Sequence, residues 1–287
     1  MRVQRQHGAV LFAADVVKLR LEISNAQGWH YGMPNSITWP SDKVKIGSRT
    51  FCQPMCKYCQ DYCLDYSSIF ADLHYILDEK SAEKKEWNGI RDHGREGLVL
   101  ADFMAFPQAK SSQLMMAELA ALRFYTSHSF NSINIPMRDM DRKAPHPLPG
   151  IVTNIQRGLK KLRALGSDDV LSKQTAVLWR GMSYMQLPPK FKDEGGTELA
   201  PLSTTTDVSV AISYAINKDT PSALLFRFVT RNNLERGADV QWLSMFPGES
   251  ETLFPPLTFL QRTRTEPQEV VHNGVKVTVV ELSTTLA

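Results

Sequence analysis

Residues 246–256 read Phe-Pro-Gly-Glu-Ser-Glu-Thr-Leu-Phe-Pro-Pro and place two carboxylates one residue apart, between a glycine turn and a proline pair. The Thr-Leu-Phe segment favours an extended backbone, in which residues i and i+2 point to the same face. Glu249 and Glu251 would then stand side by side, about 7 Å apart along the strand. Such a pair can serve a reaction, or it can be a solvated pair at the mouth of an edge strand, because acids are mostly exposed.

Two upstream stretches give this pair its context. Residues 177–181 read Val-Leu-Trp-Arg-Gly, so Arg180 lies at the end of an apolar strand. Residues 199–207 read Leu-Ala-Pro-Leu-Ser-Thr-Thr-Thr-Asp, which puts Ser203 in a second apolar strand. The ordered set of arginine, serine strand and Glu-x-Glu resembles the arginine–serine–glutamate class of mono-ADP-ribosyltransferases.

The resemblance extends over about residues 110 to 287. Residues 237–248 resemble the loop that precedes the family's glutamates, and residues 257–260 resemble its next strand. Upstream, residues 118–126 end in a Tyr-Thr pair and, together with residues 131–134, resemble the family's helical lead-in. The ordered set is far more specific than any one of its pieces.

The resemblance implies an enzyme that moves ADP-ribose from NAD, its co-substrate, to an arginine side chain of a protein acceptor and releases nicotinamide. Breaking the bond between nicotinamide and ribose leaves an oxocarbenium-like sugar, which needs negative charge beside it. The implied catalytic residues are Arg180, Ser203, Glu249 and Glu251, and the implied NAD-binding residues are Arg180, Gly181, Ser203, Thr204 and Glu251.

Each residue has an implied role. Arg180 would clamp the phosphates with its planar fork of donors, and Gly181 would let the backbone approach the nicotinamide amide. Ser203 would orient Glu251, which would bind the ribose hydroxyl and stabilise the cation, while the strand that contains Thr204 would brace the cleft. The plainer interpretations are a structural ion pair for the arginine and a strand-edge hydroxyl for the serine.

Glu249 carries the prediction of an arginine acceptor. By the resemblance, glutamate at this position marks arginine acceptors, since a carboxylate can grip a guanidinium bidentately and help to remove its proton. Upstream, Trp242 and Phe246 either form a wall for the acceptor protein or pin the loop to the core. Two other functions stay open: an NAD glycohydrolase with water as the main acceptor, and a metal-binding interaction protein with an inactive transferase fold.

The distribution of patterns predicts an α+β fold, because helical spacing precedes a series of short apolar runs. The resemblance adds a helical N-terminal part followed by a mixed, mostly antiparallel split β-sandwich of the ADP-ribosyltransferase type. We predict strands over 175–179, 199–204, 223–229, 251–254, 258–262 and 275–282, and one intervening helix over 208–215 capped by Asp207. Earlier helices are predicted from 107–112 through Thr126, with Ser111 or Ser112 as cap, and over 151–162.

We predict two domains: residues 1–106 as an accessory region of unknown role, and residues 107–287 as the transferase domain. The four cysteines lie in the first, spaced C-x3-C-x2-C-x3-C. They can form a buried stripe on a helix, a metal or iron–sulfur site, or disulfides of a secreted protein. The buried stripe is favoured, and no metal is expected. These residues are Cys52, Cys56, Cys59 and Cys63.

Composition is that of an ordinary globular protein, with 43% hydrophobic and 22% charged residues in 287. The net charge of +3 makes no case for a nucleic-acid or membrane partner. Acids and bases three or four apart in the run 78–95 predict a solvated helical face. The last residues are not an apolar tail, so we expect no membrane anchor. The cytoplasm is favoured, and secretion stays open.

Overall fold

The computed structural model describes residues 66–77, 90–139, 146, 148–165, 175–183, 190–216, 222–232, 235–263 and 266–286. These residues form two compact units. One unit holds the described residues up to Leu165 together with Val240–Gly248, and the other holds those of Gly166–Asp239 and Glu249–Ala287. The predicted boundary between residues 106 and 107 stays a prediction, and the predicted cysteine cluster lies outside the described residues.

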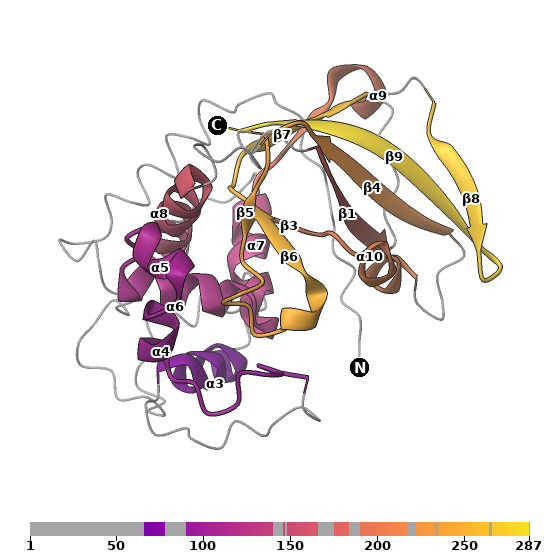
Figure 1. Ribbon diagram of the computed structural model, residues 1–287. Coiled ribbons are helices and arrows are strands. Elements are labelled where there is room, and N and C mark those ends of the chain that lie inside the picture. The colour runs from indigo at the N-terminus through magenta and orange to yellow at the C-terminus, as the bar shows by residue number, and fades with distance from the viewer. Residues whose placement is uncertain are drawn as a thin grey trace. The chain divides into compact units, whose positions relative to one another are not determined.

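The first unit is helical (Figure 1). Its elements are α3 (Tyr66–Leu77), α4 (Leu100–Met104), α5 (Pro107–Ser111), α6 (Met116–Tyr125), the 3-10 helix η2 (His128–Phe130), α7 (Asn131–Arg138) and α8 (Pro149–Leu165). In the part of the chain that the structure describes, no helix is long and apolar enough to cross a membrane.

The predicted helix from 107–112 through Thr126 is in fact two helices. Gln113 has a φ of 53°, a left-handed conformation that ends α5. The next helix, α6, is capped by the Glu118 carboxylate, which accepts a hydrogen bond of 2.8 Å from the Met115 amide. The prediction of Ser111 or Ser112 as its cap is therefore wrong, whereas the Tyr-Thr closure of α6 is confirmed by Thr126 at its C-cap.

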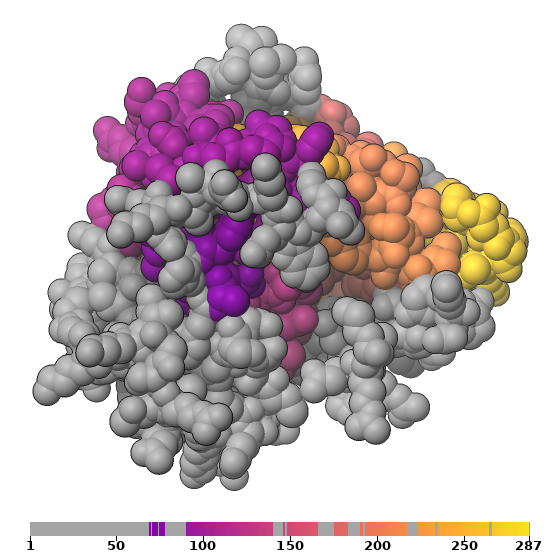
Figure 2. Space-filling model, turned by 90° about the horizontal axis from the view of Figure 1, so that it is seen from below, coloured from indigo at the N-terminus to yellow at the C-terminus, as the bar shows by residue number. Residues whose placement is uncertain are grey.

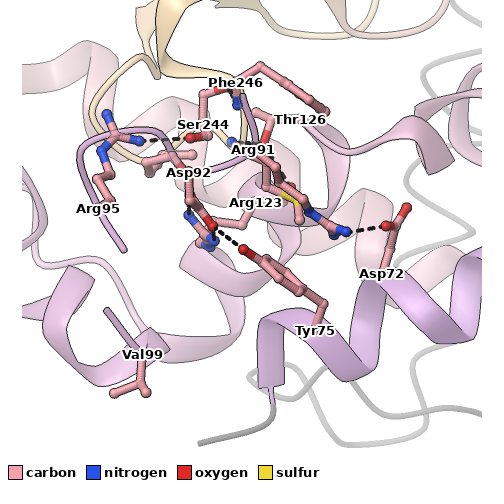
Figure 3. A network of polar contacts seen from close by, with 12 residues as sticks. Asp72, Tyr75, Arg91, Asp92, Arg95, Val99, Arg123, Thr126, Ser244 and Phe246 are labelled. Carbon is pink, nitrogen blue, oxygen red and sulfur yellow. Dashed lines mark hydrogen bonds and ion pairs between the residues drawn. The ribbon is translucent and has the colours of Figure 1, made fainter. Parts of the chain in front are cut away.

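A buried network of charges lies inside the helical unit (Figure 3). Asp92 and Arg123 pair at 2.8 Å with both side chains 1% exposed, and the Tyr75 hydroxyl donates to the same carboxylate at 2.9 Å. Nearby, Arg91 pairs with Asp72 at 3.0 Å. The solvated face predicted over 78–95 is wrong for Arg91 and Asp92, which are buried because each has a charged partner. Residues 78–89 of that run lie outside the described residues.

The same network holds residues 240–248 by their backbone. Arg123 donates to the Leu243 carbonyl at 2.9 Å. Arg95 donates to the carbonyl of Ser244 at 2.7 Å (Figure 3). The indole of Trp242, 7% exposed, lies 5.8 Å from the ring of Phe106. The burial of Trp242 favours the interpretation that this residue pins the loop to the core. It does not favour a wall for the acceptor protein.

The second unit carries a nine-stranded sheet in the order β2-β7-β9-β4-β1-β3-β6-β5, with β8 paired to β9. Strands β4 and β9 run parallel, and the other paired strands run antiparallel. The predicted α+β fold with a mixed, mostly antiparallel sheet is confirmed. The strands are β1 (Ala176–Ser183), β2 (Gly196–Glu198), β3 (Leu202–Thr205), β4 (Ser222–Thr230), β5 (Ala238–Asp239), β6 (Glu251–Phe254), β7 (Thr258–Arg262), β8 (Gln268–His272) and β9 (Val275–Thr285).

The sheet is nearly divided at its middle. Strands β1 and β3 are joined through the single register pair Trp179 and Thr205, whereas β1 pairs with β4 along its whole length. Short helices accompany the strands: α9 (Phe191–Glu194), α10 (Val208–Ala215) and the 3-10 helix η4 (Pro247–Glu249). Arg180 on β1 and Ser203 on β3 therefore flank this narrow junction.

Helix α10 begins and ends where the sequence predicts, and its Asp207 cap accepts a hydrogen bond of 2.8 Å from the Ser209 amide. The helix packs against β1 (Figure 1) through small residues. A Cβ on Gly181 would lie 1.7 Å from the carbonyl oxygen of Ala211. Only glycine fits at this position, so the structure gives Gly181 a packing role whether or not NAD is bound.

Candidate functional site

Pairing of β3 with β6 brings the predicted serine and glutamate together. Thr205 lies opposite Glu251 in the register, so Ser203, two residues earlier on the same face, lies diagonally across from Glu251. The Ser203 hydroxyl donates to Oε1 of Glu251 at 2.6 Å. Because Glu251 is 6% exposed, its carboxylate is both sheltered from water and fixed in direction.

The arginine reaches the same place from the neighbouring strand. The Nη1 atom of Arg180 donates to the backbone carbonyl of Ser203 at 3.0 Å. This contact fixes a guanidinium beside the strand that orients Glu251. Three of the predicted residues, far apart in the sequence, are therefore gathered at the β1–β3–β6 junction.

Thr204 lies on the other face of β3. Successive side chains of a strand alternate in direction, and the Thr204 hydroxyl donates to the Thr252 carbonyl at 2.8 Å while the residue is 3% exposed. This side-chain hydrogen bond links β3 to β6. Any part that Thr204 takes in holding NAD must come from its backbone.

The prediction that Glu249 and Glu251 project side by side from one strand is wrong. Strand β6 begins at Glu251, whereas Glu249 ends the short 3-10 helix η4. Between them Ser250 has a φ of 47°, a left-handed conformation that breaks the alternation of a strand. The backbone carbonyl of Glu249 accepts a hydrogen bond of 2.6 Å from the Thr205 hydroxyl, which ties this turn to β3.

Tyr214 is a residue of the site that the sequence analysis missed. Its hydroxyl donates to Oε1 of Glu249 at 2.6 Å. Partial burial, the hydrogen bond to Glu249 and the negative charges of Glu249 and Glu251 raise the pKa of the Tyr214 phenol. The phenol therefore stays protonated and acts as a donor at neutral pH, although the residue as a whole is 57% exposed. The one sequence signal for it is an aromatic residue at the end of the capped helix after Ser203.

These residues suit a dinucleotide that is cleaved at its sugar. A guanidinium matches phosphate oxygens, and an oriented, sheltered carboxylate can stabilise a developing sugar cation. Within the described ranges, no group of three or more His, Cys, Asp or Glu residues is placed to hold a metal ion.

Replacing Arg180 by lysine tests whether the guanidinium binds the dinucleotide. We expect the affinity for NAD to fall on the order of tenfold, along with turnover, because an ammonium cannot form the planar fork. Calorimetric titration with NAD measures the affinity. The control is Arg227→Lys on the adjacent strand β4, where the arginine pairs with Glu281. Unchanged affinity with a lowered melting temperature for Arg180→Lys would make it a structural residue.

Comparison with known proteins finds similar solved structures. The ADP-ribosyltransferase HopU1 of Pseudomonas syringae pv. Tomato DC3000 is 15% identical, with 74% of this chain and 95% of that chain covered, at a TM-score of 0.47. The type III effector XopAI from Xanthomonas axonopodis pv. citri is 16% identical, with 94% and 93% covered, at 0.46. Exoenzyme S from Pseudomonas aeruginosa, solved with human 14-3-3 protein beta and carba-NAD, is 18% identical, with 63% and 86% covered, at 0.42.

Neither a protein-family model nor a curated protein sequence matches the chain.

Proposed function

We propose that this protein is a mono-ADP-ribosyltransferase that transfers ADP-ribose from NAD to an arginine side chain of a protein acceptor. The observation that carries the proposal is the hydrogen bond of 2.6 Å from Ser203 to the sheltered carboxylate of Glu251, beside the guanidinium of Arg180. An oriented carboxylate next to a phosphate-binding group is what cleavage of the nicotinamide–ribose bond requires.

The residues divide the reaction between them. Arg180 binds the phosphates of NAD and places the ribose near β6. Glu251 stabilises the positive charge on the sugar as the bond between C1′ and the nicotinamide nitrogen breaks and nicotinamide leaves with the electron pair. A nitrogen of the acceptor guanidinium then bonds to C1′ and gives up a proton to the Glu249 carboxylate. Ser203 takes no proton, since its role is to hold Glu251 in place.

The proposal that the acceptor is an arginine side chain rests on Glu249. This residue is partly exposed and lies outside the strand that carries Glu251. A partly exposed carboxylate can meet an incoming guanidinium, while Glu251 remains sheltered. The separation of the two glutamates by the Ser250 turn supports a division of labour in which one serves the acceptor and the other serves NAD.

The substitution Glu249→Gln separates the two roles. We expect transfer to agmatine, an arginine mimic, to fall about tenfold or more, because the neutral amide neither pairs with a guanidinium nor removes its proton. Nicotinamide release with water as the acceptor should be largely retained, since water needs no anchor. Both products are measured in parallel from labelled NAD. An equal loss of both activities would remove the main support for an arginine acceptor.

A further inference from the structure

Two hydroxyl groups hold the two glutamates in place. Ser203 donates to Glu251, and Tyr214 donates to Glu249, each at 2.6 Å. The first contact belongs to the cleavage of NAD. The second contact, from Tyr214 to Glu249, is not needed for that step. Its contribution therefore concerns the role of Glu249 toward the acceptor.

Tyr214 is held on a rigid support. It is the penultimate residue of α10, which follows β3 directly and packs against Gly181 of β1, the residue next to Arg180. Since a Cβ at Gly181 would clash with the Ala211 carbonyl, the helix backbone has no room to move toward the sheet. Figure 2 shows α10, in orange, at the molecular surface, so Tyr214 reaches Glu249 from a fixed and exposed helix.

Hydrogen bonds hold both the backbone and the side chain of Glu249. Its backbone carbonyl is held by Thr205 on β3, and its carboxylate Oε1 is held by Tyr214 on α10. Among the described residues, no hydrogen-bond donor contacts the other carboxylate oxygen, Oε2. A neutral phenol leaves the negative charge of the carboxylate in place, so Oε2 stays available for a charged donor.

We propose that Tyr214 is a positioning residue for the acceptor: its hydroxyl fixes the Glu249 carboxylate so that the open oxygen faces an incoming guanidinium. The acceptor class is a planar cation with several N–H donors, as in an arginine side chain. This inference rests on the proposed function and deepens it, because it names the residue through which Glu249 selects the acceptor.

The test is Tyr214→Phe, which removes the hydroxyl and keeps the ring. We expect the KM for agmatine to rise about five- to tenfold, the range that the loss of one hydrogen bond gives. The KM for NAD and the rate of nicotinamide release in water should change less than twofold. In a Glu249→Gln background the same substitution should have no further effect, because Tyr214 acts through Glu249.

The matched control is Ser213→Ala, which removes the neighbouring exposed hydroxyl of the same helix; this hydroxyl donates within the helix, to the Val210 carbonyl at 2.7 Å. It should leave both activities unchanged. An unchanged KM for agmatine in Tyr214→Phe would overturn the inference, and so would an equal loss of nicotinamide release. A wild-type protein that releases no nicotinamide would overturn the proposed function itself, and this inference with it.

Discussion

Replacing Glu251 by glutamine is expected to abolish both ADP-ribose transfer and NAD hydrolysis while leaving the affinity for NAD nearly unchanged. Glutamine has the same shape and can still accept the hydrogen bond from Ser203, so the substitution removes only the charge. That charge is needed mainly when the sugar becomes cationic, which makes it a contribution to the transition state. The rate should fall hundreds-fold or more, the usual cost of losing an electrostatic stabiliser.

The control for this substitution is Glu269→Gln on strand β8, where the glutamate is exposed and pairs with Lys276. It makes the same chemical change on the same sheet and should leave both activities intact. Melting temperatures of the two variants show whether the fold is preserved. Near-normal hydrolysis by Glu251→Gln would show that this carboxylate is not the catalytic group.

The second large effect is on stability. Arg123→Ala is expected to lower the free energy of unfolding by about 3–5 kcal/mol, because it leaves the Asp92 carboxylate buried without its partner. The guanidinium also donates to the Leu243 carbonyl and lies 4.1 Å from the centre of the Phe103 ring. Denaturant titration of the purified protein measures the change.

A matched exposed pair serves as the control. Lys276 and Glu269 pair at 2.7 Å, but their side chains are 55% and 59% exposed. Lys276→Ala should therefore cost less than about 1 kcal/mol. If the two substitutions destabilise the protein equally, burial does not set the strength of the Arg123–Asp92 pair.

The sequence predicts best where the signals are local. Strands β6 and β7 and helix α10 have the bounds that their residues predict, and each is set off by nearby Pro, Gly or Asp. The joining of Ser203 with Glu251 was also predictable, because the order of the motifs resembles that of a known family. These features depend on residues that are close in sequence or on a pattern that the family repeats.

Other features depend on contacts that a single sequence does not show. The left-handed Ser250 is a conformation that glycine adopts more readily, and it separates Glu249 from the strand. Tyr214 meets Glu249 across 35 positions, and Arg123 meets Asp92 across 31. Charge patterning predicted a solvated surface at Asp92, but this residue is buried. The burial of an acid depends on a partner that can be distant in the sequence, and charge patterning does not show such a partner.

Nicotinamide release from labelled NAD, measured with and without agmatine, tests directly whether the protein is an ADP-ribosyltransferase that uses Glu251. Wild-type protein and Glu251→Gln are compared with Glu269→Gln as the control. We expect the wild type and the control to release nicotinamide and to label agmatine, whereas Glu251→Gln, though folded and able to bind NAD, should do neither. Release at the wild-type rate by Glu251→Gln, or no release by the wild type, would contradict this expectation.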